Sequence, residues 1–418
     1  MATASRPRTR PRWLFKQTVA QVKQLALRIK LRNITFCVLI PLAGMFWSFY
    51  QPLVRRTVVL AFIFYIISGI GITAGYHRLW SHRSYTASYP LRCFLALCGI
   101  SGVQGSILTW CKEHRAHHRY VDTSKDPYNV KKGLLWSHMG WIIFRSQSDV
   151  VGNADVSDLL NDKIVMWQHN NFSTLCLFTA YILPSIIAQI GWNDGLGGLL
   201  YAGIIRAFFF QQCTNCVNSL AHYLGDQPYA DKNSPRNHIL TALITFGEGY
   251  HNFHHEFPAD YRNGIRWFDY DPTKWCITLW TLLGLASHPQ QFDSNEIEKA
   301  IYQQKQKQVQ RLKSRINWGH PLEALPIYTW SEYEALCVNK GGSRHLVCIA
   351  GVIYDVASFI DDHPGGRALI LASVGKDATA SFHGGVYDHS KAASNLLDNM
   401  RFGVLRRGGR VEAYDESL

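Results

Sequence analysis

The sequence predicts a mainly helical membrane protein followed by a small domain of mixed helix and strand. Four apolar stretches each come close to the roughly 20 residues that a helix needs to cross a bilayer. Eight histidines gather in three short boxes next to hydrophobic sequence. From about Pro321 the pattern changes to short strands alternating with helical segments. These three observations together predict the fold class.

The expected spans cover residues 33–50, 57–76, 172–191 and 197–218. A fifth apolar run, 91–109, would place two histidine boxes on opposite faces if it crossed, and one metal centre cannot draw ligands from both faces. We therefore expect this run to lie against the membrane surface or to re-enter it. A four-helix bundle then carries a helical cap that holds every box, with both termini on the same side. Residues 1–32 contain nine Lys or Arg and no acid, which marks that side as cytosolic.

Charge is unevenly placed along the 418 residues. The chain carries +13 overall, whereas 322–410 holds nine basic and nine acidic residues and the tail 411–418 holds three acids. A basic body beside apolar stretches favours anionic lipid headgroups or a phosphorylated substrate. Nucleic acid is not an expected partner, because no nucleic-acid motif accompanies the charge. Ten cysteines without a disulfide rhythm suit a reducing compartment, and no secretory signal peptide is expected.

The histidine boxes read HRLWSH, HRAHH and HNFHH. They hold His77 and His82, then His114, His117 and His118, then His251, His254 and His255. In the second and third boxes the spacing i, i+3, i+4 puts all three rings on one helical face. The i, i+5 spacing of the first box diverges by about 140° on a regular helix, so it suits a helix end whose two ligands serve different metals.

Many converging neutral imidazoles indicate more than one metal ion. His222 in NSLAH adds a ninth imidazole beside the amide of Asn218. Structural zinc is satisfied by four ligands, so nine nitrogens beside a lipid-facing cavity favour two redox-active irons. Such a centre can activate O₂ for attack on an unactivated C–H bond.

The segments HRLWSH, EHRAHH, NSLAH, GEGYHNFHH and DYDPTK (269–274) resemble the acyl-CoA Δ9 desaturases, the stearoyl-CoA desaturase family, over about residues 30–290. The resemblance implies a mushroom-shaped four-helix bundle under a cytosolic cap, with a di-iron centre. One metal would take His77, His114, His118 and His254, with a water that Asn218 holds. The other would take His82, His117, His222, His251 and His255.

The same resemblance implies substrate contacts. Coenzyme A would be held by Asn33, Lys112 and Arg145, with Gln104 and Trp110 nearby in the acyl tunnel. Two positions depart from the family pattern: Ser146 replaces a second basic residue, and Asn215 replaces a large aromatic. We further expect Tyr65 and Ala61, 12 and 16 residues before His77, to lie at the closed end of the tunnel and to set chain length.

Residues 291–321 are rich in Gln, Lys and Arg and are expected to form a solvated helix or linker. Beyond them, strands are expected at 346–349 and 351–354, and helices near 366–374 and 390–400. His363 in HPGG and His389 further on could supply both axial ligands of a haem, with His383 as the competing second ligand. The segment 322–410 resembles the cytochrome b5 domain, fused at the C-terminus as in the fungal arrangement. Acids near the haem could meet the basic cap: Asp361, Asp362, Asp377 and Asp388.

The leading hypothesis is therefore an endoplasmic reticulum acyl-CoA desaturase. It would use O₂, two iron ions and haem b to insert a cis Δ9 double bond into palmitoyl- or stearoyl-CoA, with electrons from NADH-cytochrome b5 reductase. A membrane hydroxylase of the same histidine-box type is the alternative. A membrane-anchored electron carrier is disfavoured, because an anchor needs one helix and no histidine clusters.

Overall fold

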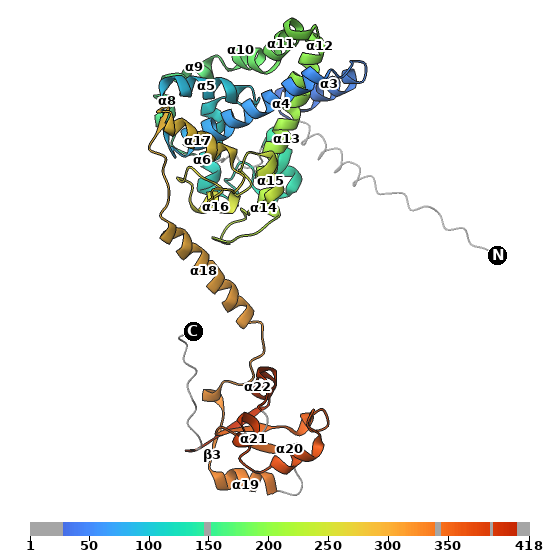
Figure 1. Cartoon of the computed structure of the whole chain (residues 1–418), viewed down its shortest axis with the longest axis vertical. Coiled ribbons are helices and arrows are strands. Elements are labelled where there is room, and N and C mark those ends of the chain that lie inside the picture. The colour runs from blue at the N-terminus through green and yellow to red at the C-terminus, as the bar shows by residue number, and fades with distance from the viewer. Residues whose placement is uncertain (1–27, 146–151, 339–343, 385–387, 408–418) are drawn as a thin grey trace, which may run out of the picture. The chain divides into compact units, whose positions relative to one another are not determined.

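The computed structural model describes residues 28–145, 152–338, 344–384 and 388–407. The expected basic segment 1–32 and acidic tail 411–418 lie mostly or wholly outside these residues. Contacts divide the chain into two compact units, Met1–Gln306 and Lys307–Leu418 (Figure 1). The first unit is almost entirely helical, and the second contains a four-stranded sheet. The predicted fold class, mainly helical with a small mixed domain, is confirmed.

Among the described residues, three helices are long and apolar enough to cross a membrane: Leu31–Ser48, Arg55–Ser81 and Phe172–Trp192. Each is continuous but contains π-type turns. They are built from α2 (Leu31–Ile34), η1 (Thr35–Leu39) and α3 (Ile40–Ser48); from α4 (Arg55–Ile70) and η2 (Gly71–Ser81); and from α10 (Phe172–Leu177), η5 (Phe178–Ile182) and α11 (Leu183–Trp192).

The fourth expected span is also a helix, running through α12 (Gly195–Gly197), η6 (Gly198–Ile205) and α13 (Arg206–Asn218). It is less apolar than the other three, because Arg206 and several amides interrupt it. It packs antiparallel to the first helix: Gln211 donates to Cys37 Sγ at 3.4 Å, and Tyr201 donates to the carbonyl of Ser48 at 2.9 Å. The two helices are therefore in contact near both of their ends.

The ambiguous run 91–109 does not form a span. It is divided between α5 (Tyr89–Ile100) and the start of α6 (Ile107–Tyr120). Twelve residues of helix cover about 18 Å, well short of the roughly 30 Å hydrocarbon layer. The outer residues of α5 are exposed and its inner residues, including Leu95, are fully buried against η2. This agrees with the expectation that the run does not cross.

The cap is built from short helices and loops around the ends of the long helices. Its elements are η3 (Val130–Lys132), η4 (Trp136–Gly140), α7 (Trp141–Ile143), α8 (Ser157–Leu160), α9 (Lys163–Asn170), α14 (Leu220–Tyr223), α15 (Ile239–Ile244), α16 (His251–Glu256) and α17 (Pro272–Leu282). A two-residue pairing of β1 (Thr86–Ala87) with β2 (Ala286–Ser287) ties the end of the cap to the start of α5. The largest hydrophobic core lies where η2, α5, α6 and α17 meet.

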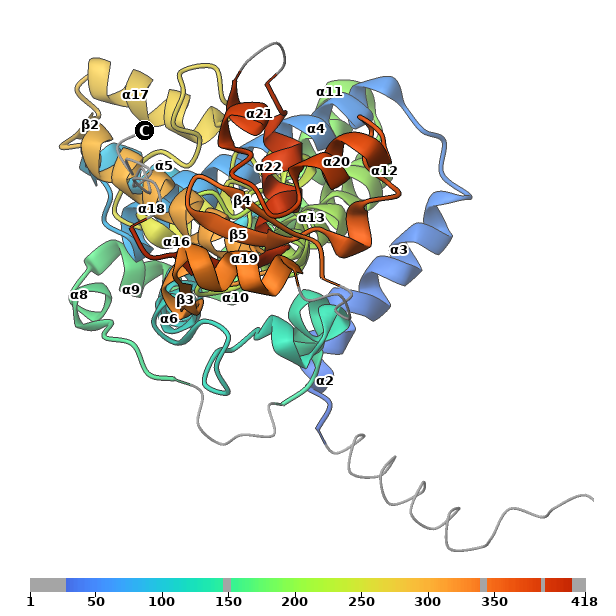
Figure 2. The same cartoon turned by 90° about the horizontal axis from the view of Figure 1, so that it is seen from below.

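The second unit begins within α18 (Ser294–Lys313), the expected polar helix. Its sheet has the order β3-β6-β5-β4, with β3 (Ile327–Tyr328), β4 (Leu346–Ile349), β5 (Val352–Asp355) and β6 (Arg401–Leu405). Alternate strand residues pack on opposite faces: Val347 and Tyr354 pack toward the side chains of α20 (Arg367–Ser373), α21 (Thr379–His383) and α22 (Lys391–Asp398), and Leu346 and Ile353 toward α19 (Trp330–Val338). Figure 2 shows these helices on the two sides of β4 and β5.

Candidate metal centre

The nine predicted imidazoles come together in the first unit. His77 lies on η2 and His82 directly after it, while α6, α14 and α16 carry the rest. Their ring nitrogens form two groups, in each of which the candidate ligand atoms all lie within 4.8 Å of one another. We call them the first set, which contains His77, His82, His114, His118 and His254, and the second set, which contains His117, His222, His251 and His255.

In the first set, His254 Nε2 lies 3.0 Å from the Nε2 atoms of both His77 and His118. His82 Nε2 lies 2.8 Å from that of His114. In the second set, His251 Nε2 lies 3.0 Å from that of His222 and 3.1 Å from that of His255. The stacked rings of His118 and His255, 4.1 Å apart at their centroids, join the two sets.

The geometry groups His82 differently from the division of ligands that the resemblance implies. Its ring lies 4.6 Å from those of His118 and His254, inside the first set. The physical reason is the π-type turn at the end of η2, in which the His82 N–H donates to the His77 carbonyl at 3.1 Å. An i→i+5 bond closes a wider turn, so the two rings lie 4.8 Å apart instead of diverging as on a regular helix.

The donor set fits metal ions. Two nitrogens bound in neighbouring positions to one metal at about 2.1 Å stand about 3 Å apart, which is the separation found here. Metal ligation also needs neutral imidazole. Burial, reinforced by neighbouring imidazoles, holds the pKa well below its ordinary value in seven of the rings: His82, His114, His118, His222, His251, His254 and His255.

A buried ionic network stands behind the first set, and we did not predict it from the sequence. Glu248 Oε2 lies 2.7 Å from His77 Nδ1, and its other oxygen accepts from Arg78 at 3.0 Å. The fully buried Arg78 also donates two hydrogen bonds to Asp271, at 2.9 and 3.1 Å. Burial acts to raise the pKa of Glu248, but His77 and Arg78 outweigh it and hold that pKa below its ordinary value. The signal was present, because Glu248 and Asp271 belong to GEGYHNFHH and DYDPTK.

The second set has its own buried carboxylate. Asp126 Oδ1 lies 2.9 Å from His117 Nδ1, and Asp126 otherwise accepts only backbone N–H groups, from Asp122 and Tyr128, among its described hydrogen bonds. Another ring of this set, His222, places Nδ1 2.8 Å from Ser234 Oγ, and Ser234 in turn donates to Asp122 at 2.5 Å. Occupying Nδ1 in this way fixes the ring orientation and leaves Nε2 as the ligand nitrogen.

A cavity of about 1100 Å³ reaches from the molecular surface to the two sets. Four predicted substrate residues line it: Asn33, Gln104, Trp110 and Arg145. The Trp110 ring stacks on His114 at 4.8 Å, and its indole N–H donates to Gln104 at 3.2 Å. Lys30, Arg32 and Arg145 make the cavity basic where the first helix begins, whereas Ile72, Phe210 and Phe246 make another part of the wall apolar.

The other substrate residues lie elsewhere. Lys112 is exposed on α6 and does not line the cavity. Tyr65 does not line it either: its ring packs behind two lining residues, Phe210 at 5.4 Å and Phe246 at 5.7 Å. Ala61 packs into a separate cluster with Leu60 and Phe64. Neither Tyr65 nor Ala61 therefore lines the cavity that His77 lines.

Of the two departures from the family pattern, Ser146 lies outside the described residues. Asn215 is buried on α13 and lines the cavity, and its amide Nδ2 has no hydrogen-bond partner among the described residues. Asn218, one turn later, also lines the cavity and precedes His222 of the second set by four residues. The resemblance assigned Asn218 to the first set, which already contains five imidazoles.

The second unit brings His363 and His389 together, with ring centroids 6.3 Å apart and planes 26° from parallel. Each Nδ1 faces a backbone carbonyl, that of Gly366 at 3.2 Å and that of Phe382 at 3.1 Å, so Nε2 is the nitrogen that would meet a haem iron. His383 is exposed and packs on Phe382. The geometry therefore favours the predicted pair. Of the four predicted acids, Asp361 pairs with Arg367 and Asp377 accepts from the backbone of Thr379.

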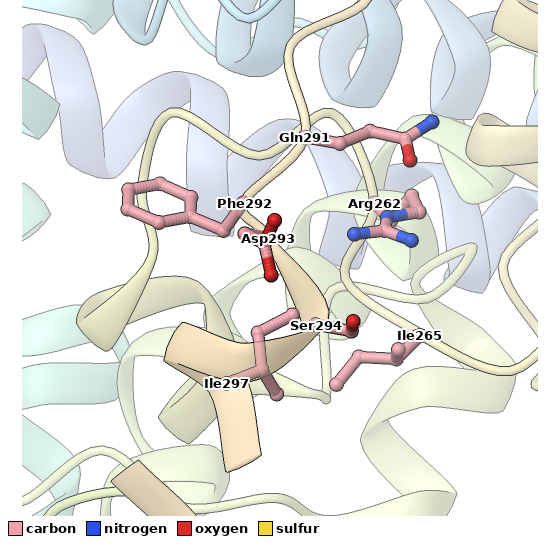
Figure 3. Close-up of a pocket in the computed structure, with 7 residues that line it drawn as sticks. All are labelled: Arg262, Ile265, Gln291, Phe292, Asp293, Ser294 and Ile297. Carbon is pink, nitrogen blue, oxygen red and sulfur yellow. The ribbon is translucent and has the colours of Figure 1, made fainter. Parts of the chain in front are cut away.

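A second hollow of about 440 Å³ lies at the start of α18, where Arg262 and Ile265 face Ser294 and Ile297 (Figure 3). The guanidinium of Arg262 already forms an ion pair with Asp260 at 2.8 Å. Asp260 also accepts a hydrogen bond from the backbone N–H of Phe292 at 2.9 Å. None of its lining residues belongs to either histidine set. The hollow therefore belongs to the anchoring of α18 and not to the metal centre.

Comparison with known proteins identifies two family matches. Residues 54–277 match the family described as fatty acid desaturase, and residues 329–406 match the cytochrome b5-like heme/steroid binding domain. The first match contains all nine clustered histidines, and the second contains His363 and His389.

Acyl-CoA desaturases of other organisms align with most of this chain. A probable acyl-CoA desaturase of Schizosaccharomyces pombe is 49% identical over 91% of this chain and 79% of its own length. Acyl-CoA desaturase 1 of Saccharomyces cerevisiae is 48% identical over 85% of this chain and 69% of its own. Stearoyl-CoA desaturase 5 of Bos taurus is 36% identical over 64% of this chain and 81% of its own.

Proposed function

Because this chain belongs to the fatty acid desaturase family and carries a fused cytochrome b5 domain, we propose that it inserts a cis double bond at Δ9 of palmitoyl- or stearoyl-CoA. Its general class, an acyl-CoA desaturase and hence an oxidoreductase, follows from the family. The observation that carries the finer proposal is the cluster of nine imidazoles, mostly buried, beside a cavity of about 1100 Å³ with a basic entrance and an apolar wall.

The cofactors of such an enzyme are two iron ions and haem b. We assign one iron to the first set and one to the second, with Asn218 completing the second set through a water molecule. When bound, the irons supply the activation of O₂ that removal of two hydrogens from an unactivated chain requires. The protein supports this chemistry by keeping the rings neutral through burial and by holding Nδ1 of His77 and His117 with Glu248 and Asp126.

The cavity supports recognition of an acyl-CoA. Basic groups of Lys30, Arg32 and Arg145 stand where a phosphorylated coenzyme would lie, and phosphate binding by such groups is favourable. Asn33 lies beside them, and Lys112 on the nearby surface of α6 adds a further charge. An acyl chain entering past Trp110 and His114 would then run along Ile72, Phe210 and Phe246. The wall excludes water from the reacting carbons, and Tyr65 supports it from behind.

Electrons reach the centre from the second unit in this proposal. His363 and His389 would hold a haem between their imidazoles, and that haem would supply electron transfer. NADH-cytochrome b5 reductase is the proposed source of those electrons, and O₂ is the co-substrate. Fusion raises the effective concentration of the donor without requiring a tight interface.

The apolar helices make this a membrane protein. We propose that it lies in the endoplasmic reticulum membrane, contacts its lipid, and has both termini in the cytosol. The basic residues 1–32 support that orientation.

The test is product analysis with the purified protein in lipid vesicles, supplied with stearoyl-CoA, NADH and the reductase but no separate cytochrome b5. Oleoyl-CoA, with the double bond at Δ9, is the expected product, and palmitoyl-CoA should give the matching C16 product. A hydroxylated acyl chain would reject desaturation, and a double bond at another carbon would reject the Δ9 assignment alone.

A further inference from the structure

Two short cap helices carry apolar side chains that face outward. On α15, Leu240 is 63% exposed and Leu243 is 47% exposed. On α17, Leu279 is 53% exposed and Leu282 is 79% exposed. Contiguous exposed apolar residues of this kind mark a surface that contacts something other than water. Figure 1 shows α15 beside α13, and α17 packs against η2 at the end of the second long helix.

The depth of α15 follows from its contact with the second long helix. Tyr65 donates a 2.6 Å hydrogen bond to the carbonyl of Ile244, the last residue of α15. Tyr65 lies ten residues after Arg55, which is about 15 Å along the helix axis. The hydrocarbon layer is about 30 Å thick, and Arg55 and Arg56 mark its far edge in the proposed topology. The end of α15 therefore lies near the middle of that layer.

The depth of α17 follows in the same way. Thr73 and Thr273 join their hydroxyls at 2.6 Å, and Thr73 lies 18 residues, or about 27 Å, after Arg55. The first turn of α17 therefore lies near the cytosolic edge of the layer. Trp267 is exposed next to it and accepts from Trp275 of α17 at 3.2 Å. Exposed tryptophan at this level is typical of a membrane–water interface.

The surface of α15 continues that of the long helices. The neighbour of Tyr65, Ile66, is exposed, and so is Phe209, the neighbour of the Phe210 ring that Tyr65 contacts. α15 packs against α13 as well. Exposed residues of the two long helices thus flank α15 at the same depth. The outer face of α15 should therefore contact the same surroundings as these two helices.

We propose that α15 and the outer face of α17 contact the acyl chains of membrane lipid, α15 inside the hydrocarbon layer and α17 at its cytosolic edge. This rests on the membrane topology in the proposed function. Thr245 and Phe246, directly after α15, line the substrate cavity, so α15 lies close to that cavity.

The test uses the full-length protein in phosphatidylcholine vesicles that contain a small fraction of phosphatidylcholine with a mid-chain diazirine. After illumination, labelled peptides are mapped by mass spectrometry. Residues 239–244 should be labelled within about threefold of the lipid-facing segment 58–66, and 275–283 at a lower level. The matched control is 302–312 of α18, where Tyr302, Val309 and Leu312 are as exposed and as apolar but belong to a polar helix.

Labelling of 239–244 and 275–283 at the level of 302–312 would overturn the proposal, and would leave a protein partner or a second copy of the chain as the cover of this face. A diazirine placed near the headgroup should reverse the order and label α17 above α15; the opposite order would overturn the assigned depths. Loss of label at 58–66 would reject the topology itself. Desaturation assayed in the same vesicles separates these outcomes from failure of the proposed reaction.

Discussion

The two histidine sites of this chain are built on opposite plans. The metal centre gathers nine imidazoles from four separated segments, mostly buried and backed by carboxylates. The haem pair needs two half-buried rings from one short stretch, each backed by a backbone carbonyl. The difference follows from the chemistry proposed for each. Oxygen activation beside a hydrocarbon needs a closed site from which water is excluded, whereas electron transfer needs a site close to the surface.

A similar contrast separates the two halves of the metal centre. Glu248, behind the first set, forms an ion pair with Arg78, and Arg78 forms a second ion pair with Asp271. Asp126, behind the second set, meets only His117 and backbone N–H groups among the described residues. A carboxylate makes the imidazole that it contacts a stronger metal ligand. The uncompensated charge of Asp126 should therefore strengthen His117 more than Glu248 strengthens His77.

The largest effect is expected from removing an iron ligand. His118→Ala or His255→Ala should bring desaturation below detection, because each takes an imidazole from the place where the two sets meet. The haem absorption spectrum should be unchanged, since the haem pair belongs to the other unit. His288→Ala, which removes an exposed histidine outside both sets, is the control and should retain activity. Loss of haem in the His118 or His255 variant would show that the two sites are not independent.

Removing a haem ligand should also abolish self-sufficient turnover, but reversibly. His363→Ala or His389→Ala should lose the b-type spectrum, and an excess of soluble cytochrome b5 should restore product formation with the iron centre intact. His383→Ala should keep both haem and activity, because that ring is exposed and packs on Phe382. An unchanged spectrum in the His389 variant, together with haem loss in the His383 variant, would reverse the assignment.

Smaller effects are expected from the carboxylates. Asp126→Asn and Glu248→Gln should weaken iron binding by about 10–100-fold, with the larger loss at Asp126. The rate of iron loss to a chelator measures this independently of turnover. Asp260→Asn, a buried carboxylate paired with Arg262 away from the centre, serves as the control. Equal iron retention in all three variants would mean that neither carboxylate supports its histidine.

The smallest effect is expected from a change in pH. Burial holds the folded-state pKa of seven clustered imidazoles below the value of about 6.5 that they have in an unfolded chain. The unfolded, metal-free chain therefore binds protons first, so stability and iron retention should be complete above about pH 6.5 and should fall as pH drops below it. Iron release followed at pH 7.5 and 5.5 should be several-fold faster at pH 5.5. Faster release at the higher pH would contradict the assignment.

Local pattern was enough to predict much of this molecule. Hydrophobic length located the long helices. Box spacing identified eight of the nine clustered imidazoles, and His222 was added because it follows the fourth expected span. Strands at 346–349 and 352–355 were expected within a residue of where they lie. Turn geometry left no local pattern: the π-type turn after His77 places His82 in the first set, and Tyr65 lies behind the cavity wall. Long-range contacts such as Arg78 with Asp271 and the pairing of β6 with β5 left no local periodic signal.

The central claim is that one chain holds a two-iron centre and a separate haem. It is tested most directly by metal and haem analysis of an active preparation, with haem counted from its pyridine complex and total iron and zinc measured on the same sample. The account predicts three irons per chain, of which one belongs to haem and two do not, and no stoichiometric zinc. Stoichiometric zinc in active protein, or a single iron beyond the haem, would contradict it.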